Sequence, residues 1–142
     1  MITTWTERHL AGHWSLRRRI LHADGTVWTL TGVARFCPLD DGLRQIEEGT
    51  LTGPGGARIH ATRTQLWRYA DTTVEIAFAD GRPFHRLALG AAMARVRHFC
   101  PPDAYTGRFT AQGADLWWSF WRVVGPRKDY RMQTRYTRSG AP

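Results

Sequence analysis

The sequence predicts an all-β protein, a single antiparallel up-and-down β-barrel with a short helical turn near its N-terminus. Turn signals recur about every 8–14 residues, among them Asp24-Gly25, Asp80-Gly81 and Gly125-Pro126. The segments between them are rich in Trp, Val, Ile, Thr and Tyr, the residues that strands prefer. Many short strands joined by short turns favour an antiparallel meander, and closure into a barrel removes its exposed edges.

Length and composition are those of one globular domain over residues 1–142. Hydrophobic residues make up 42% of the chain and aromatic residues 12%, which excludes a disordered protein. The longest uncharged apolar run, residues 87–94, is far shorter than the ~20 residues that a membrane-spanning helix needs. The N-terminus has neither the basic nor the apolar region of a signal peptide, so we expect a cytoplasmic protein without a membrane span.

Period-two alternation assigns an inner face to most of the predicted strands. The first two strands place inward Trp14, Leu16, Arg18, Ile20 and His22, and then Trp28, Leu30, Gly32, Ala34 and Phe36. The later strands place inward Ala61, Arg63, Gln65, Trp67 and Tyr69; Val74, Ile76 and Phe78; Val96, His98 and Cys100; Tyr105, Gly107 and Phe109; and Tyr130, Met132, Thr134 and Tyr136. Gly32 suggests a bend or a bulge. Residues 4–10 suggest one helical turn that closes a barrel end, capped by Thr3 or Thr4.

For two segments the sequence leaves the structure undecided. Residues 116–124 are apolar on both faces, so either Trp117, Ser119, Trp121 and Val123 or the alternating set of Leu116, Trp118, Phe120 and Val124 points inward. In residues 87–94, a helix or a loop competes with a strand.

The predicted inner face is mixed rather than uniformly apolar. Its polar members are Arg18, His22, Arg63, Gln65, His85, His98, Cys100, Tyr105, Tyr130, Thr134 and Tyr136. Each buried polar group without a partner costs a few kcal/mol, so these residues predict a cavity that holds water or a polar ligand. Barrels of about eight to ten strands can enclose one small molecule. The alternative is a register error of one residue, which would turn these groups outward.

A small anionic or amphipathic molecule is therefore the predicted ligand. Guanidinium groups grip carboxylates and phosphates, which makes Arg18 and Arg63 candidate counter-charges. The other predicted ligand-binding residues are Trp28, Trp67, Tyr130 and Tyr136. Apolar or stacking walls would come from Trp14, Trp28 and Trp67. Two structural readings compete, an internal salt bridge such as Arg63 with Glu48, and an arginine stacked on Trp14.

An enzyme of the isomerase or cyclase type is the first alternative. His85 or His98 would act as the base, with Asp103 orienting the histidine and Tyr105 nearby. Asp103 could equally cap the turn after Pro101-Pro102. His85, His98 and Cys100 could together hold a metal, but CxxC, HxxxH and HExxH spacings are absent, so neither a metal nor a cofactor is predicted.

The formal net charge is +8, and of the 20 basic residues 19 are Arg and one is Lys. Because the chain has no lysine-rich cluster and no basic tail, nucleic acid is not the expected partner. A nucleic-acid- or protein-binding module remains the second alternative, with Arg17, Arg19, Arg131 and Arg135 on the outer face. We expect a monomer or a small homo-oligomer.

Two resemblances support the barrel. Gly12-x-Trp14 resembles the opening of the calycin barrels (lipocalins, fatty-acid-binding proteins and avidins), in which this Trp closes one end beneath a basic residue of the last strand. That resemblance implies such a role for Arg135 or Arg138. Nearly the whole chain resembles an uncharacterised bacterial family, domain of unknown function 6314. The motifs that carry this resemblance are Gly12-x-Trp14-x-x-x-Arg18-x-Ile20, Glu48-Gly49-x-Leu51, Asp80-Gly81-Arg82-Pro83-Phe84-His85, His98-x-Cys100-x-Pro102-Asp103-x-Tyr105, Trp121-x-Val123-x-Gly125-Pro126-Arg127-Lys128-Asp129-Tyr130 and Thr134-x-Tyr136-x-Arg138. This resemblance implies a small lipocalin-like barrel and no established activity.

Overall fold

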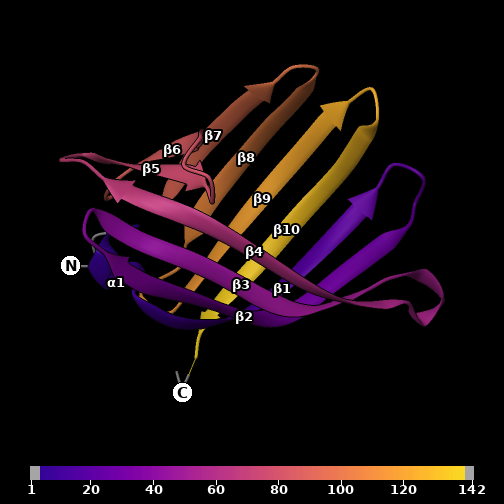
Figure 1. Cartoon of the computed structure of the whole chain (residues 1–142), viewed down its shortest axis with the longest axis horizontal. Helices are drawn as coiled ribbons and strands as arrows, with labels where there is room; N and C mark the ends of the chain where they lie inside the picture. The colour runs from indigo at the N-terminus through magenta and orange to yellow at the C-terminus, as the bar shows by residue number, and fades with distance from the viewer. Residues whose placement is uncertain (1–3, 140–142) are drawn as a thin grey trace.

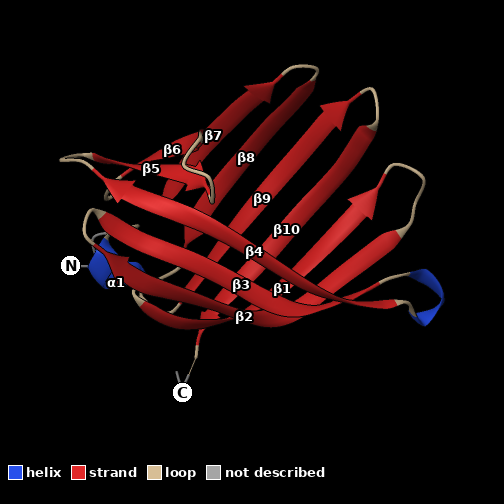
Figure 2. Cartoon of the chain, in the orientation of Figure 1, coloured by secondary structure: helices blue, strands red, loops and turns tan. Residues whose placement is uncertain are grey.

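Ten antiparallel strands form almost the whole protein in a computed structural model that describes residues 4–139 (Figure 2). They are β1 (Gly12–His22), β2 (Val27–Leu39), β3 (Gly42–Thr52), β4 (Arg58–Tyr69), β5 (Thr73–Phe78), β6 (Pro83–Ala88), β7 (Met93–Cys100), β8 (Asp103–Ala111), β9 (Leu116–Gly125) and β10 (Lys128–Arg138). One helical turn, α1 (Glu7–Leu10), precedes them, and a short 3₁₀ turn η1 (Pro54–Gly56) links β3 to β4. Within residues 4–139, no helix is long and apolar enough to span a bilayer.

The strands form one sheet in the order β6-β5-β4-β3-β2-β1-β10-β9-β8-β7. β6 and β7 are its two edges and lie close together, so the sheet curls into a nearly closed barrel. Figure 1 shows the β1–β2, β3–β4, β7–β8 and β9–β10 turns on one side of the molecule and α1 on the other. We call these the open end and the closed end of the barrel.

Alternation along the chain places the inner side chains as predicted. In β1, Trp14, Leu16 and Arg18 are buried while Ser15 and Arg17 are exposed. The same pattern holds for the predicted inner residues of β2, β4, β8 and β10, all of which are buried or half-buried. For β9 the structure selects the face of Trp117, Ser119, Trp121 and Val123, the four residues of this strand that are buried. The cross-strand neighbours, which no local pattern reveals, decide this choice.

Gly32 permits a close approach of two strands rather than a bulge. The β2–β3 ladder passes through it without a register shift and pairs it with Gly49. A Cβ on Gly32 would lie 2.1 Å from the carbonyl oxygen of Glu48 and 2.6 Å from Cα of Gly49. A larger residue at either position would therefore push β2 and β3 apart.

Other local expectations need correction. The cap of α1 is Thr6, whose side chain accepts a hydrogen bond from the His9 amide; Thr4 instead donates to the carbonyl of Ala91, and Thr3 lies outside the described residues. Residues 87–94 are neither one helix nor one strand, because β6 ends at Ala88 and β7 begins at Met93. Cys100 is exposed at the end of β7, since the alternation no longer buries its side chain where the strand leaves the barrel.

The closed end is an aromatic plug that Arg138 holds in place. Trp5, Leu10 and Trp14 are fully buried there, and the Trp14 indole donates to the Leu10 carbonyl at 2.8 Å. The Arg138 guanidinium lies 4.2 Å from the Trp14 ring centroid and donates to the carbonyls of His9, Ala11 and Ala114 and to the Asp115 carboxylate. Arg138 thus takes the role that the calycin resemblance implies, and Arg135 points outward.

Replacing Arg138 should loosen the closed end. We expect Arg138→Ala to lower the free energy of unfolding by about 2–3 kcal/mol, because several hydrogen bonds and a cation–π contact are lost together. Arg135→Ala, three residues away on the outer face, is the matched control and should change it by less than ~0.5 kcal/mol. Urea denaturation followed by tryptophan fluorescence measures both. Equal effects of the two substitutions would contradict this role of Arg138.

Candidate functional site

The centre of the barrel holds a carboxylate, Glu47, between two guanidinium groups. Oε1 of Glu47 lies 2.8 Å from an Nη of Arg18 and 3.0 Å from an Nη of Arg63. Its Oε2 accepts hydrogen bonds from the Gln45 amide at 2.8 Å and from the Tyr136 hydroxyl. Four strands, β1, β3, β4 and β10, supply these side chains, and Glu47 itself is only 2% exposed.

Neighbouring side chains extend this cluster and satisfy its outer atoms. Nε of Arg18 donates to the Thr134 hydroxyl at 2.8 Å, and one Nη donates to the Tyr136 hydroxyl at 3.1 Å. The Trp67 indole donates to the amide oxygen of Gln45 at 2.8 Å. We call Arg18, Gln45, Glu47, Arg63, Thr134 and Tyr136 the polar layer, because they cross the barrel at one level.

The ionisation of Glu47 follows from this setting. Burial by itself would raise the pKa of the Glu47 carboxyl, but the charges of Arg63 and Arg18 and the hydrogen bonds from Tyr136 and Arg18 outweigh it and hold the pKa at about 2. Burial and the Glu47 charge raise the pKa of Tyr136 above its usual range. The carboxylate is therefore ionised and the phenol neutral at pH 7, and two cations face one anion.

Glu47 is not among the site residues that the sequence predicts. The internal salt bridge of Arg63 is made with Glu47 and not with Glu48, because the β3–β4 ladder pairs Arg63 with Glu47 and leaves Glu48 exposed on the outer face. The arginine stacked on Trp14 is Arg138 rather than Arg18. Alternation through Leu43, Gln45 and Glu47, all buried, is the signal that would have identified the carboxylate.

A small enclosed cavity lies beside the polar layer. Gln45, Arg63, Gln65, Phe84, His85, Phe109, Trp117, Ser119, Trp121 and Tyr136 line it. The centre of a water molecule can move through about 10 Å³ of it, so it has room for about one water. Two buried lining atoms, Nδ1 of His85 and Nε1 of Trp117, have no hydrogen-bond partner within residues 4–139.

His85 is a buried, neutral imidazole. Its ring packs against Phe84, Phe109 and Trp121, with centroid separations of 4.8 to 5.2 Å. Burial, with a smaller contribution from the charge of Arg63, lowers the pKa of His85 to about 3. Such a histidine is a weak proton acceptor at neutral pH.

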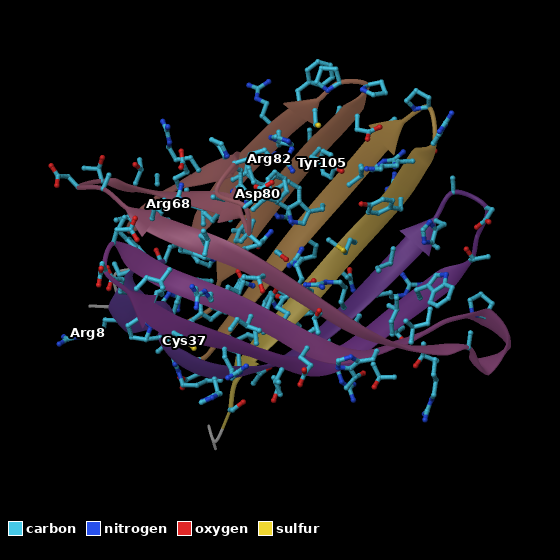
Figure 3. All side chains as sticks on the ribbon, in the orientation of Figure 1. Arg8, Cys37, Arg68, Asp80, Arg82 and Tyr105 are labelled. Carbon is cyan, nitrogen blue, oxygen red and sulfur yellow. The ribbon has the colours of Figure 1, made fainter. Side chains whose placement is uncertain are left out.

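The open half of the barrel has a more exposed lining of aromatic and titratable groups. In the layer of inward-pointing residues nearest the turns, His22 lies opposite Tyr130 and His98 lies opposite Tyr105 on neighbouring strands. The next layer of inward-pointing residues, one step further from the turns, contains Trp28, Met132 and Trp121. Figure 3 labels Tyr105 on β8, toward the β7–β8 turn.

The residues proposed for acid–base chemistry do not form one hydrogen-bonded group. His98 packs 5.1 Å from Phe84 and 5.7 Å from Tyr105, between ring centroids. Asp103 lies 3.1 Å from Nζ of Lys128, which also donates to the Tyr105 hydroxyl at 3.0 Å. No hydrogen bond within the described chain joins Asp103 to either histidine. Nor do three or more His, Cys, Asp or Glu side chains of residues 4–139 come together as a metal site.

The structure thus separates the predicted ligand-binding residues into three levels. Arg18, Arg63 and Tyr136 belong to the polar layer. Trp28 and Tyr130 line the open half, where both are half-buried. Trp67 is a core residue, 1% exposed and packed 5.6 Å from Phe36 between ring centroids.

Comparisons with known proteins concern the family and the fold. The model of a family of unknown function, DUF6314, matches residues 10–138. No curated protein matches the sequence. An S-type phycobiliprotein lyase from Guillardia theta is similar in structure, with a TM-score of 0.67 and 8% identity over 95% of this chain and 91% of that one. A de novo designed fluorescence-activating β-barrel has a TM-score of 0.45 and 11% identity, over 94% of this chain and 96% of the designed one. At this identity, the likeness to the lyase concerns the fold alone.

Removing the charge of Glu47 should leave two buried cations without a counter-ion. We expect Glu47→Gln to lower the free energy of unfolding at pH 7 by about 3–5 kcal/mol. Since the pKa of Glu47 is about 2 in the folded protein and 4.5 in the reference state, the stability it contributes is complete above pH ~4.5 and disappears as the pH falls toward 2. Chemical denaturation between pH 7 and 2 tests this. Glu48→Gln, which changes the exposed neighbour, should leave the pH dependence as it is in the wild type.

Protonation of His85 should destabilise the barrel at a higher pH than protonation of Glu47. The pKa of His85 falls from 6.5 to about 3 on folding, so its contribution is complete above pH ~6.5 and is lost as the pH falls toward 3. One such proton gives a slope of at most about 1.4 kcal/mol per pH unit. His85→Gln should flatten the stability curve between pH 6.5 and 4.5, whereas His13→Gln on the exposed surface should not. Burial also lowers the pKa of His9, which leaves a smaller residual slope.

Proposed function

Because the chain belongs to a family of unknown function, DUF6314, whose name assigns no activity, we propose its function from the geometry of the barrel. We propose that the barrel binds a small amphipathic molecule with an acidic group. The acidic group would lie against Arg63 above the polar layer, and the body of the ligand would occupy the open half.

One observation carries the proposal: the polar layer holds more positive than negative charge. Arg18 and Arg63 share one carboxylate, Glu47, so the layer has a net charge of +1. Arg18 is 6% exposed and donates to Thr134, Glu47 and Tyr136. The Arg63 side chain, by contrast, is 35% exposed and lines the small cavity. A second anion beside Arg63 would balance the charge in a setting of low polarity, where such contacts are strong.

The size of the cavity indicates where the ligand body would lie. The enclosed space holds about one water, which is too small for a metabolite. The open half offers the apolar faces of Trp28, Met132 and Trp121 together with the hydroxyls of Tyr105 and Tyr130. Apolar walls with a few polar groups are typical of sites for small molecules.

Catalysis is the weaker candidate. With a pKa near 3, His85 is a poor general base at pH 7, and Asp103 is held by Lys128 rather than by a histidine. The structurally similar lyase has, by its name, an activity of its own, but a shared fold does not transfer function. The proposal therefore favours binding, in the cytoplasmic setting that the sequence predicts.

Native mass spectrometry of the purified protein is the direct test. An added mass that disappears under denaturing conditions would support a ligand and give its molecular weight. The bare mass of the chain, for protein purified from its own host as well as from an expression host, would count against a tightly bound ligand.

An amphipathic anion should bind with an affinity that depends on Arg63. The probe is 8-anilinonaphthalene-1-sulfonate, whose fluorescence rises in apolar sites. We expect Arg63→Gln to weaken its binding about tenfold, or about 1.4 kcal/mol, because the sulfonate loses a charge-assisted contact. Arg63→Lys should retain most of the affinity.

The matched control is Arg58→Gln, an exposed position on the same strand, β4. Titration of probe fluorescence, with near-ultraviolet circular dichroism to verify folding, measures all three variants. Equal affinity of the Arg63→Gln and Arg58→Gln variants for the probe would contradict the role of Arg63 as a counter-charge.

A further inference from the structure

The outer face of β1, β7, β8, β9 and β10 carries rows of arginine that the ladder register brings together. Three arginine pairs lie directly opposite each other on neighbouring strands: Arg17 with Arg135, Arg131 with Arg122, and Arg108 with Arg95. Arg19 and Arg97 point to the same face, which makes eight arginines. The five strands contain two carboxylates, Asp103 and Asp129, both close to the turns of the open end.

This arrangement has an energetic cost that folding alone does not explain. Like charges directly opposite each other in a sheet destabilise it. Arg122 pairs with Asp129, but the other seven arginines have no ion pair with a carboxylate within residues 4–139. Acidic side chains occur instead on other strands of the barrel, for example Glu48 on β3 and Glu75 on β5.

Two aromatic side chains lie among these arginines. Trp118 and Phe120 point outward from β9, with ring centroids 5.8 Å apart and planes 9° from parallel. Trp118 pairs with Arg135 across the ladder, and the Arg108 guanidinium lies 4.6 Å from the Phe120 centroid. Both rings are half-buried, so each keeps part of its surface open to solvent.

The face is hollowed rather than flat. Three adjoining hollows of about 530, 560 and 430 Å³ follow it from β7 to β2. Gln133 lines all three, Phe120 and Arg108 line the first two, and Trp118 lines the second and third. Because they share these lining residues, the three shallow hollows adjoin one another, and we call them together the outer groove.

We propose that this outer groove binds single-stranded nucleic acid, with phosphates on the arginines and bases on the rings of Trp118 and Phe120. A positive groove with interleaved aromatic rings is the arrangement that binds single strands without sequence preference. Guanidinium groups suit phosphate because they donate in a planar fork. The composition disfavours nucleic acid because lysine is rare, but the register supplies the concentrated charge that the linear sequence does not show.

The two rings argue against other polyanions. A bilayer surface would pair its head groups with the arginines but would offer no planar group to the two rings, whereas an extended single strand of nucleic acid offers both phosphates and bases. An acidic peptide would pair with the arginines but would have no planar group for the two rings. Duplex nucleic acid keeps its bases stacked inside, so it would use only the charge.

Fluorescence anisotropy with a labelled oligothymidylate of about 12 nucleotides tests the proposal. We expect binding at low salt that is stronger than for the duplex of the same length. The triple variant Arg19→Gln/Arg108→Gln/Arg131→Gln should weaken it at least tenfold. The slope of log K against log salt concentration should become shallower by about 2, since each phosphate contact on a single strand contributes ~0.7.

A second variant separates stacking from charge. Trp118→Val/Phe120→Val should weaken binding about tenfold without changing the salt slope, because stacking releases no counter-ion. The matched control for charge is Arg35→Gln/Arg44→Gln/Arg58→Gln, which removes three exposed arginines of β2, β3 and β4 that do not line the hollows and should leave binding close to that of the wild type. Near-ultraviolet circular dichroism verifies that each variant is folded.

Several outcomes would overturn the proposal. Equal binding of the duplex, or of polyglutamate at equal charge, would mean that charge alone acts. Binding to phosphatidylglycerol vesicles without binding to the oligonucleotide would assign the groove to a membrane surface. Equal losses in the two triple variants would show that the groove has no special role.

Discussion

The buried carboxylate of Glu47 is the interaction on which the interior of this barrel depends. It accepts hydrogen bonds from side chains of β1, β3, β4 and β10, strands that come from the beginning, the middle and the end of the chain. A charge in a setting of low polarity is tolerated only where every partner is in place, and here each carboxylate oxygen has at least two donors. A register slip in any of these strands would leave a charge unpaired, so the polar layer also specifies the strand pairing.

The polar layer divides the inside of the barrel into two unlike halves. Toward α1, the plug of Trp5, Leu10 and Trp14 is fully buried, and Arg138 closes it from the last strand. Toward the turns, the inward side chains of Trp28, Tyr105 and Tyr130 are half-buried. The excess positive charge lies at the boundary between these halves, where a ligand entering from the open end would meet it.

The same strands present a different chemistry on each face. Along β10, Tyr130, Thr134 and Tyr136 point inward while Arg131 and Arg135 point outward, and β9 turns Trp121 inward and Trp118 outward. Because side chains alternate between the two faces of a strand, the same strands can contribute both to the proposed interior site and to the proposed outer groove. The two proposals rest on different side chains, Arg63 inside and Arg19, Arg108, Arg131, Trp118 and Phe120 outside, so substitutions can address each surface separately.

The sequence by itself determined what depends on local pattern: the all-β barrel, the turns, the inner faces of β1, β2, β4, β8 and β10, and the inward position of Arg18 and Arg63. Alternation and turn chemistry act over a few residues, so they can be read from the chain. Only the tertiary structure decided which residues meet. It paired Arg63 with Glu47 rather than Glu48, turned Trp117 and Trp121 inward, left Cys100 exposed and aligned arginines from five strands. These outcomes depend on ladder register and barrel closure, which join residues up to about 120 positions apart and which a local pattern does not encode.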